Sequence, residues 1–337
     1  MKAIVQHRYG SVDDLALSEV PRPEPAADEV LVRVRAASVH PDVWHVVAGR
    51  PAVLRLMGSG VRRPRERVPG TDVAGVVESV GSAVTRFEPG DEVFGETIRG
   101  VQWRNGGAFA EYATAPEEGL ALKPSGVSFE EAAAVPTVGL IALNNLPRRR
   151  VPPGTRVLVN GAAGGVGAVA VQLAKSYGAE VTGVDHESKL ALVRSLGADR
   201  VIDYTSEDFT RSGEHWDLIF DVPGNHSFKA IRRALDPRGS YVLIGHDAFG
   251  ATGHRWLGSI PRLLGLVARS AVSPQLRGGS FASPDKRQLV GTLVDLMEAG
   301  QLRVVVDRIF PLSQAPQAMR HLMSGHSLGR VVLRIDH

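Results

Sequence analysis

A glycine-rich turn between an apolar strand and a helix constrains this chain more than any other stretch. The apolar run at 157–160 is followed by glycines at intervals of three, Gly161, Gly164 and Gly167, and then by apolar residues at helical spacing. Glycines let the backbone turn tightly and let a ligand approach without meeting a Cβ. The helix that follows presents free N–H groups and the positive end of its dipole to an anion. The pattern therefore predicts a pyrophosphate-binding turn, built from Gly161, Gly164, Gly165, Val166 and Gly167.

An acidic residue at the end of the next apolar run supports a dinucleotide site. Residues 180–184 are followed by Asp185, roughly twenty residues beyond Gly167. At this distance a carboxylate bonds the adenosine ribose in dinucleotide-binding folds, and it repels the 2′-phosphate of NADP. His186 and Lys189 lie close by and would soften that repulsion. We therefore expect an NAD(P)H cofactor, with NAD(H) favoured over NADP(H) and with Asp185 and Lys189 among its ligands.

Strand and helix alternate along the second half of the chain, as is typical of a parallel sheet with helices on both faces. The expected strands are 157–160, 180–184, 201–202, 218–221 and 241–244, with helices at 188–196 and 227–235 and a final strand–helix–strand at 303–309, 314–324 and 329–335. Earlier residues carry short alternating runs with glycines at the corners of a small β-rich unit. A length of 337 residues suits two cores better than one. The predicted fold class is α/β, a doubly wound parallel sheet plus a β-rich domain.

Composition excludes several classes of protein. The chain has no cysteine, so it has no disulfides, no thiolate nucleophile and no cysteine-bound zinc. Its 39 basic and 36 acidic residues leave a net charge of only +3, and no nucleic-acid partner is expected. The N-terminus lacks the apolar core of a signal peptide, and no run reaches the roughly 18 apolar residues of a membrane span. We expect a cytoplasmic protein without a membrane partner.

One stretch departs from this even charge distribution. Between residues 50 and 67 the chain carries six arginines among glycines and prolines: Arg50, Arg55, Arg62, Arg63, Arg65 and Arg67. A solvated loop is the favoured interpretation, and a rim that steers anions is the alternative.

Several motifs spread along the chain carry a family resemblance. They are Met1-Lys2-Ala3-Ile4 with Tyr9-Gly10, Gly70-Thr71-Asp72-Val73-Ala74-Gly75 leading to Pro89-Gly90-Asp91, the glycine-rich turn with Val171-Gln172-Leu173-Ala174, Leu196-Gly197-Ala198-Asp199, and the stretch 326–332. Over nearly its whole length the chain resembles the medium-chain dehydrogenase/reductase superfamily, in particular its zinc-free, quinone oxidoreductase-like branch. The resemblance implies a GroES-like catalytic domain in two pieces, 1–125 and 284–337, and a Rossmann domain at 126–283. It also implies an active site between the domains and a homodimer formed through the cofactor domain.

The zinc ligands of related enzymes do not survive in this chain. In zinc-dependent relatives a cysteine, a histidine and a second cysteine hold the catalytic metal, and matching motifs places these positions at His40, Thr71 and Ala133. Only His40 has a nitrogen or sulfur donor, and a catalytic zinc needs three suitable ligands. The resemblance therefore implies an enzyme without zinc.

Without a Lewis acid, hydride transfer favours a substrate that is already electrophilic, such as a quinone or an α,β-unsaturated carbonyl. His40, Asp42 and His45 are the polar residues expected to supply a proton or a hydrogen bond. Asp42 and His45 match the proton-relay positions of zinc-containing relatives, although this branch often has asparagine in place of His40. A carboxylate beside an imidazole would hold it protonated near neutral pH. The alternative is that each histidine only bonds to the backbone.

Further cofactor contacts are expected around the nicotinamide. Thr137 matches the threonine that relatives place against this ring. The loops at 222–224 and 244–246, including Val222 and Gly245, follow strands at the edge where open α/β sheets bind ligands. Ordinary turn chemistry is the alternative for both loops. The apolar stretch 255–270, with its spaced arginines, is expected to form a mobile cover or a dimer surface.

The sequence thus predicts a cytoplasmic, zinc-independent NAD(P)H oxidoreductase acting on quinones, enones or related carbonyls. Two rivals stay open. One is a zinc-free alcohol or aldehyde reductase. The other is a cofactor-binding regulatory or RNA-binding protein with incidental turnover, for which the arginine-rich stretch 50–67 is the only support.

Overall fold

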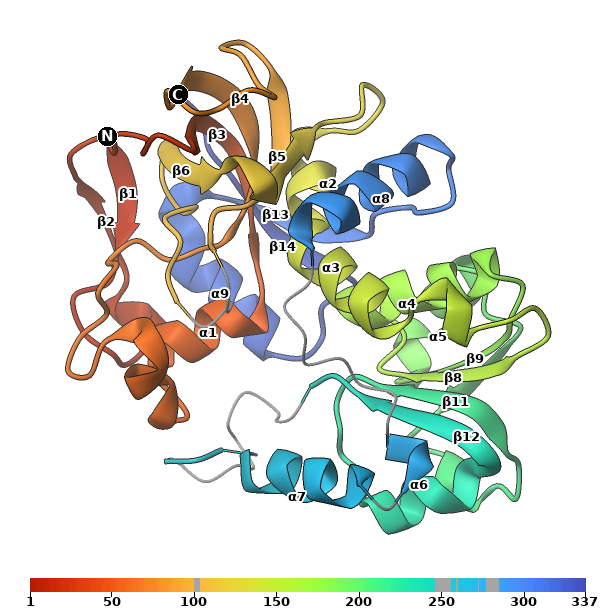
Figure 1. The fold of residues 1–337 in the computed structure, drawn as a ribbon. Helices are drawn as coiled ribbons and strands as arrows, with labels where there is room; N and C mark the ends of the chain where they lie inside the picture. Colours follow the sequence, from red (N-terminus) through yellow and green to blue (C-terminus); the bar gives the residue numbers. More distant parts are fainter. Residues whose placement is uncertain (100–103, 246–255, 259, 272, 277–284) are drawn as a thin grey trace. The chain divides into compact units, whose positions relative to one another are not determined.

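The chain forms two compact units in a computed structural model (Figure 1). The structure describes residues 1–99, 104–245, 256–258, 260–271, 273–276 and 285–337. The first unit comprises Met1–Thr137, Asp285–Gly300 and Val304–His337, and the second comprises Val138–Pro284 with Gln301–Arg303. Residues 126–137, which the sequence grouped with the cofactor domain, thus cluster with the first unit.

The first unit is built around a seven-stranded sheet in which β3 is the central and longest strand. The sheet order is β13-β14-β3-β4-β5-β7, and β6 also pairs with β3. Its strands are β3 (Glu29–Val39), β4 (Asp72–Val80), β5 (Glu92–Glu96), β6 (Tyr112–Pro116), β7 (Leu120–Leu122), β13 (Val306–Pro311) and β14 (Arg330–Arg334). A separate hairpin joins β1 (Lys2–Val5) to β2 (Ala16–Glu19). The C-terminal strands therefore complete a sheet that the N-terminal residues began.

Among the described residues, the α-helices that belong wholly to this unit are α1 (Pro41–Ala48), α2 (Phe129–Ala134), α8 (Lys286–Glu298) and α9 (Ala315–Met323). Ser128 is the N-cap residue of α2, because its hydroxyl accepts the Glu131 N–H while the Glu131 carboxylate accepts the Ser128 N–H. This capping box starts α2, whose buried alanines pack against β3 and β4.

The second unit has the predicted doubly wound architecture. Its five-stranded sheet is parallel throughout and has the order β10-β9-β8-β11-β12. The strands are β8 (Arg156–Asn160), β9 (Glu180–Asp185), β10 (Arg200–Asp203), β11 (Trp216–Asp221) and β12 (Leu235–Leu243). Because the chain moves outward in both directions from β8, the strand order reverses between β8 and β11. Open α/β sheets bind ligands at such a switch point.

Helices cover both faces of this sheet. Figure 1 shows α4 and α5 on one face and α6 and α7 on the other. Their bounds are α4 (Gly165–Ser176), α5 (Leu190–Ser195), α6 (Phe228–Ala234) and α7 (Ile260–Ser270), and α3 (Pro136–Asn145) begins at the boundary of the two units. No helix within the described ranges is long and apolar enough to cross a membrane.

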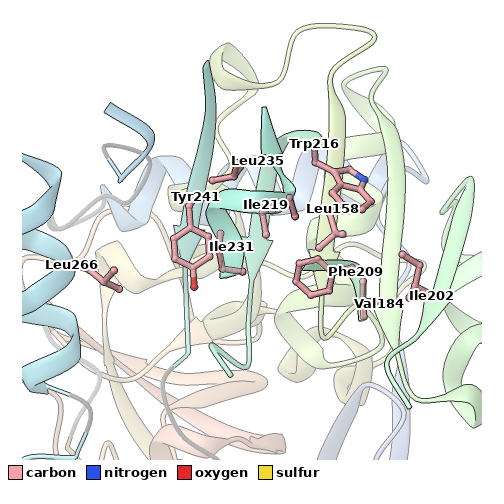
Figure 2. Packing of buried hydrophobic residues seen from close by; sticks show 11 residues of the cluster. Leu158, Val184, Ile202, Phe209, Trp216, Ile219, Ile231, Leu235, Tyr241 and Leu266 are labelled. Atoms are coloured by element: carbon pink, nitrogen blue, oxygen red, sulfur yellow. The ribbon is translucent and has the colours of Figure 1, made fainter. Parts of the chain in front are cut away.

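Alternate strand residues on one face of the sheet form a continuous core with α6 and α7 (Figure 2). The strands contribute Leu158, Val184, Ile202, Ile219 and Tyr241, and the covering segments contribute Phe209, Ile231 and Leu266. Burying a side chain of this size contributes roughly 1.5–3 kcal/mol, so this layer holds the strand ends that carry the glycine-rich turn.

Candidate cofactor and active site

The glycine-rich turn has the backbone geometry that its sequence predicted. Gly161 follows β8 with a φ of 78°, a left-handed conformation that favours glycine. A Cβ on Gly167 would lie 2.0 Å from the Gly161 carbonyl oxygen, so only glycine lets α4 pack this closely against the turn. The fold itself therefore requires both residues.

Gly164 is different, because nothing in the protein requires a glycine there. Its φ of −72° is open to any residue, and an added Cβ would meet only the Gly161 oxygen at 3.4 Å. Gly164 is also the N-cap of α4, and no side chain caps this helix. The first N–H groups of α4, including those of Gly165, Val166 and Gly167, have no partner within the helix. An uncapped helix start without a Cβ in front of it fits a pyrophosphate.

Asp185 closes one side of the turn. It ends β9, and its buried carboxylate accepts the Ala163 N–H at 2.8 Å and the His186 N–H at 2.9 Å. Each carboxylate oxygen keeps a further lone pair for a ribose hydroxyl. Lys189 ends a short turn just beyond, and its side chain is half-buried.

The loops after β11 and β12 meet beside Gly161. A Cβ on Gly161 would lie 3.3 Å from the Val222 Cβ, and one on Gly245 would lie 2.1 Å from the Val222 carbonyl oxygen. The structure therefore brings Val222, Gly245 and the glycine-rich turn together at the carboxyl edge of the sheet. His246 lies outside the described residues.

The carboxylate that holds these loops, that of Asp221, was not predicted from the sequence as a site residue. Asp221, fully buried at the end of β11, accepts hydrogen bonds from Asn160 Nδ2, the Gly224 N–H and the Tyr241 hydroxyl. Burial and the neighbouring Asp221 carboxylate raise the pKa of Tyr241, which keeps its hydroxyl a donor. Its position at the end of the predicted strand 218–221 was the signal in the sequence that could have identified Asp221.

His40 lies in the first unit as the N-cap residue of α1 and is almost completely buried. Its Nε2 lies 2.7 Å from the Thr71 hydroxyl, and its Nδ1 lies 3.7 Å from an Asp42 oxygen. The expectation that the carboxylate keeps this imidazole protonated is wrong. Burial lowers the pKa of His40 to about 3, outweighing the opposing effect of Asp42, and Arg330 lowers this pKa further. At neutral pH His40 is an uncharged hydrogen-bonding group.

His45 is also buried, on the next turn of α1. Its Nδ1 lies 2.8 Å from the Arg50 carbonyl oxygen, which fits an Nδ1–H donor and matches the backbone-bonding alternative. The ring lies edge-on to Trp44 at 5.0 Å between centroids. These contacts fix the orientation of the ring, and its proton-transfer role stays a prediction.

Thr137 belongs to a buried polar cluster in the first unit. Its hydroxyl lies 2.5 Å from an Asp72 oxygen and 3.0 Å from a Glu96 oxygen. Arg330 pairs with Asp72 at 3.1 Å, and Lys286 pairs with Glu96 at 2.6 Å. Burial raises the pKa of both carboxyl groups, although each has a cationic partner. The Thr137 hydroxyl thus already has two carboxylate neighbours within the protein. Its contact with a nicotinamide ring stays a prediction.

Within this cluster, only Thr137 was predicted from the sequence as a site residue. Asp72 and Arg330 lie within motifs that carry the family resemblance, whereas Glu96 and Lys286 carried no recognisable local signal. The predicted site residues therefore divide between the units. The glycine-rich turn, Asp185, Lys189, Val222 and Gly245 belong to the second, whereas His40, Asp42, His45 and Thr137 belong to the first.

Within the described ranges, no three histidine, cysteine or acidic side chains are grouped to hold a metal ion. At the position of the relatives' second ligand, the Thr71 hydroxyl bonds to His40, and at the third position lies the buried methyl group of Ala133.

Comparisons with known proteins agree with both units. A family model described as an alcohol dehydrogenase GroES-like domain matches residues 26–125, and one described as a zinc-binding dehydrogenase matches residues 196–333. The chain is 35% identical to an Arabidopsis thaliana NADPH-dependent alkenal/one oxidoreductase, over 99% of this chain and 79% of that protein. It is 33% identical to a Solanum lycopersicum 2-methylene-furan-3-one reductase, with the same coverage.

A solved structure has the same fold as this chain. The quinone oxidoreductase from Coxiella burnetii superposes with a TM-score of 0.83 at 28% identity, covering 100% of this chain and 99% of that one. The resemblance read from the motifs is therefore confirmed, and this chain belongs to the quinone oxidoreductase-like branch of the medium-chain dehydrogenase/reductase superfamily.

Proposed function

We propose that this protein is an NAD(P)H-dependent oxidoreductase that reduces the activated double bond of enones or enals, or a quinone, without zinc. The observation that carries the proposal is the open start of α4, where Gly164 has no structural need to be glycine. The names of the relatives point to the same chemistry. When bound, the cofactor supplies the hydride.

The neutral state of His40 favours this substrate class over the rival alcohol or aldehyde reductase. An isolated carbonyl needs a strong acid or a Lewis acid at its oxygen, because hydride addition leaves a strongly basic alkoxide. The His40–Thr71 pair is uncharged and offers only hydrogen bonds. An enone or a quinone needs less stabilisation at its oxygen, because hydride addition leaves an enolate or a phenolate, in which the charge is delocalised.

Different protein groups would bind the pyrophosphate and the adenosine ribose of the cofactor. The N–H groups of Gly165, Val166 and Gly167 would bind the pyrophosphate, and Asp185 would bind the adenosine ribose. We propose a preference for NADH, because the Asp185 carboxylate is tied to the turn by the Ala163 N–H and cannot readily turn away from a 2′-phosphate. The name of the Arabidopsis relative, which specifies NADPH, is the counter-argument.

Zinc independence, a homodimer and a cytoplasmic location are part of the same proposal. Zinc independence is inferred from the side chains at the three matching positions, because only His40 among them has a nitrogen or sulfur donor. Dialysis against a chelator should leave turnover unchanged. Sedimentation velocity tests the dimer, and fractionation of the source cell tests the location.

One assay separates the candidate functions. Oxidation of NADH and of NADPH is followed with an enal, an enone, a quinone and a saturated aldehyde, and the products are identified. Turnover of the first three with little on the aldehyde supports the proposal. Turnover confined to the aldehyde supports the alcohol or aldehyde reductase, and negligible turnover with salt-dependent RNA binding supports the regulatory rival. A tenfold preference for NADPH would overturn the proposed role of Asp185.

A further inference from the structure

None of the residues proposed above for catalysis or cofactor binding lies in the arginine-rich stretch 50–67. It follows α1 directly and is drawn in orange in Figure 1. The body of the unit fixes it at several points. The Tyr9 hydroxyl donates to the Gly60 carbonyl at 2.6 Å, and the Arg55 guanidinium lies 4.5 Å above the Tyr9 ring while its Nε donates to the Gly49 carbonyl. One of the six arginines therefore serves the loop itself.

The far end of the stretch is fixed as well. Asn105 Nδ2 donates to the Glu66 carbonyl at 2.7 Å, and the Gln6 N–H donates to the Arg67 carbonyl at 2.8 Å. Between these anchors the Arg65 N–H donates to the Ser59 carbonyl. The stretch is thus a held loop whose side chains have a defined direction.

Two apolar side chains point away from this framework. Leu56 is 73% exposed and Val61 is 64% exposed, which places both among the most exposed large apolar residues in the described part of the chain. Since folding buries such side chains wherever the chain can cover them, two on one held loop indicate a surface that something else covers.

Four arginines follow these apolar residues in the chain. Arg62, Arg63, Arg65 and Arg67 are all exposed, and within the described ranges none of their side chains makes a hydrogen bond or an ion pair. Glu66 is the single acidic residue of the stretch. The loop therefore combines unpaired guanidinium groups with uncovered aliphatic groups.

We infer that this loop docks onto an anionic lipid bilayer, with Leu56 and Val61 entering the boundary between headgroups and acyl chains and the four arginines binding lipid phosphates. Peripheral attachment of this kind needs both an apolar and an electrostatic contribution, and the loop supplies both. It requires no membrane-spanning helix, so it is compatible with the sequence expectation that none exists. It does replace the expectation that the protein has no membrane partner.

The other partners fit less well. Single-stranded nucleic acid would use the arginines, but it stacks its bases on aromatic rings, and the exposed apolar groups here are aliphatic. A second copy of this chain, paired through the same surface about a twofold axis, would set the arginine clusters against each other. A solvated loop leaves Leu56 and Val61 uncovered.

Vesicle flotation tests the inference on the full-length protein. Vesicles of phosphatidylcholine alone are compared with vesicles containing about one-third phosphatidylglycerol, at low and high salt. We expect binding to the anionic vesicles only, weakened by salt. Arg62→Glu with Arg63→Glu should lower the partition coefficient about tenfold or more. The control, Arg232→Glu with Arg233→Glu on the exposed face of α6, changes the net charge equally and should bind as wild type.

The absence of cysteine allows a second readout that separates insertion from adsorption. Val61→Cys carries a single environment-sensitive dye, and its emission should shift to the blue on anionic vesicles, whereas a dye at Leu17→Cys on β2 should not respond. Equal binding to both vesicle types, equal loss in the α6 control, or no emission shift at residue 61 would overturn the inference. So would loss of RNA binding or of self-association in the Arg62/Arg63 variant without any vesicle binding.

Discussion

The glycine-rich turn of the second unit and the buried charged cluster of the first are built on opposite principles. The turn ends in a helix whose first N–H groups have no capping side chain. The cluster pairs Asp72 with Arg330, pairs Glu96 with Lys286, and links the two carboxylates through Thr137. The turn leaves polar groups available to a ligand, whereas the cluster uses them within the protein.

Because of this difference, the two regions should respond differently to substitution. An open backbone site needs specific glycines but contributes little to folding, because its donors are satisfied only when a ligand arrives. A closed cluster of buried charges needs all of its members, since removing one leaves its partner buried and uncompensated. Substitutions in the cluster should therefore affect stability, and substitutions in the turn should affect binding.

The largest effect is expected at Arg330. Arg330→Met leaves Asp72 buried without its cation and should lower the free energy of unfolding by about 3–5 kcal/mol, as measured by urea denaturation. Arg334→Met is the matched control, because the Arg334–Glu130 pair is exposed and should add little stability. Similar losses in both variants would show that the cluster is not a closed unit.

The second largest effect is expected at His40, on the pH dependence of stability. Burial lowers the pKa of His40 to about 3, so below pH 6.5 the unfolded chain binds a proton at this imidazole that the folded chain does not. Stability is therefore lost as pH falls from 6.5 toward 3, by up to about 1.4 kcal/mol per pH unit. His40→Asn should flatten this slope, and the exposed His7→Asn should not. An unchanged slope in His40→Asn would mean that this imidazole is solvated.

Two glycines of the turn should respond differently. Gly167→Ala drives a Cβ against the Gly161 oxygen and should cost about 1–3 kcal/mol of stability. Gly164→Ala should leave the melting temperature nearly unchanged but weaken NAD(P)H binding about tenfold, measured by fluorescence titration. Wild-type affinity in Gly164→Ala would remove the strongest argument for a pyrophosphate at this turn.

The smallest effect is expected at Asp185. Asp185→Asn removes the negative charge and keeps one acceptor oxygen, so the Ala163 N–H stays bonded, the His186 N–H loses its partner, and stability should fall by only about 1 kcal/mol. The ratio of kcat/KM for NADPH over NADH should rise, because a 2′-phosphate no longer meets a carboxylate. Asp199→Asn, in the same unit at its ion pair with Lys175, should leave the ratio unchanged. No change in the Asp185 variant would place cofactor selection elsewhere.

The features that could be predicted from the sequence are those that local geometry dictates. Spacing and apolar periodicity located the strand, turn and helix around Gly161–Gly167, the acid at Asp185 and the alternating elements of the second unit. Each of these depends on residues within a few positions of one another, so the information lies in the local chain.

The protonation and pairing of the polar residues in the first unit depend on contacts between distant parts of the chain. Asp72 and Arg330 lie 258 residues apart in the chain, and no local pattern marks them as partners. The sequence placed Asp42 beside His40, but burial by the surrounding strands and helix, rather than that neighbour, controls its protonation. Desolvation is a property of everything packed around a group, and it exists only once the distant parts of the chain have come together.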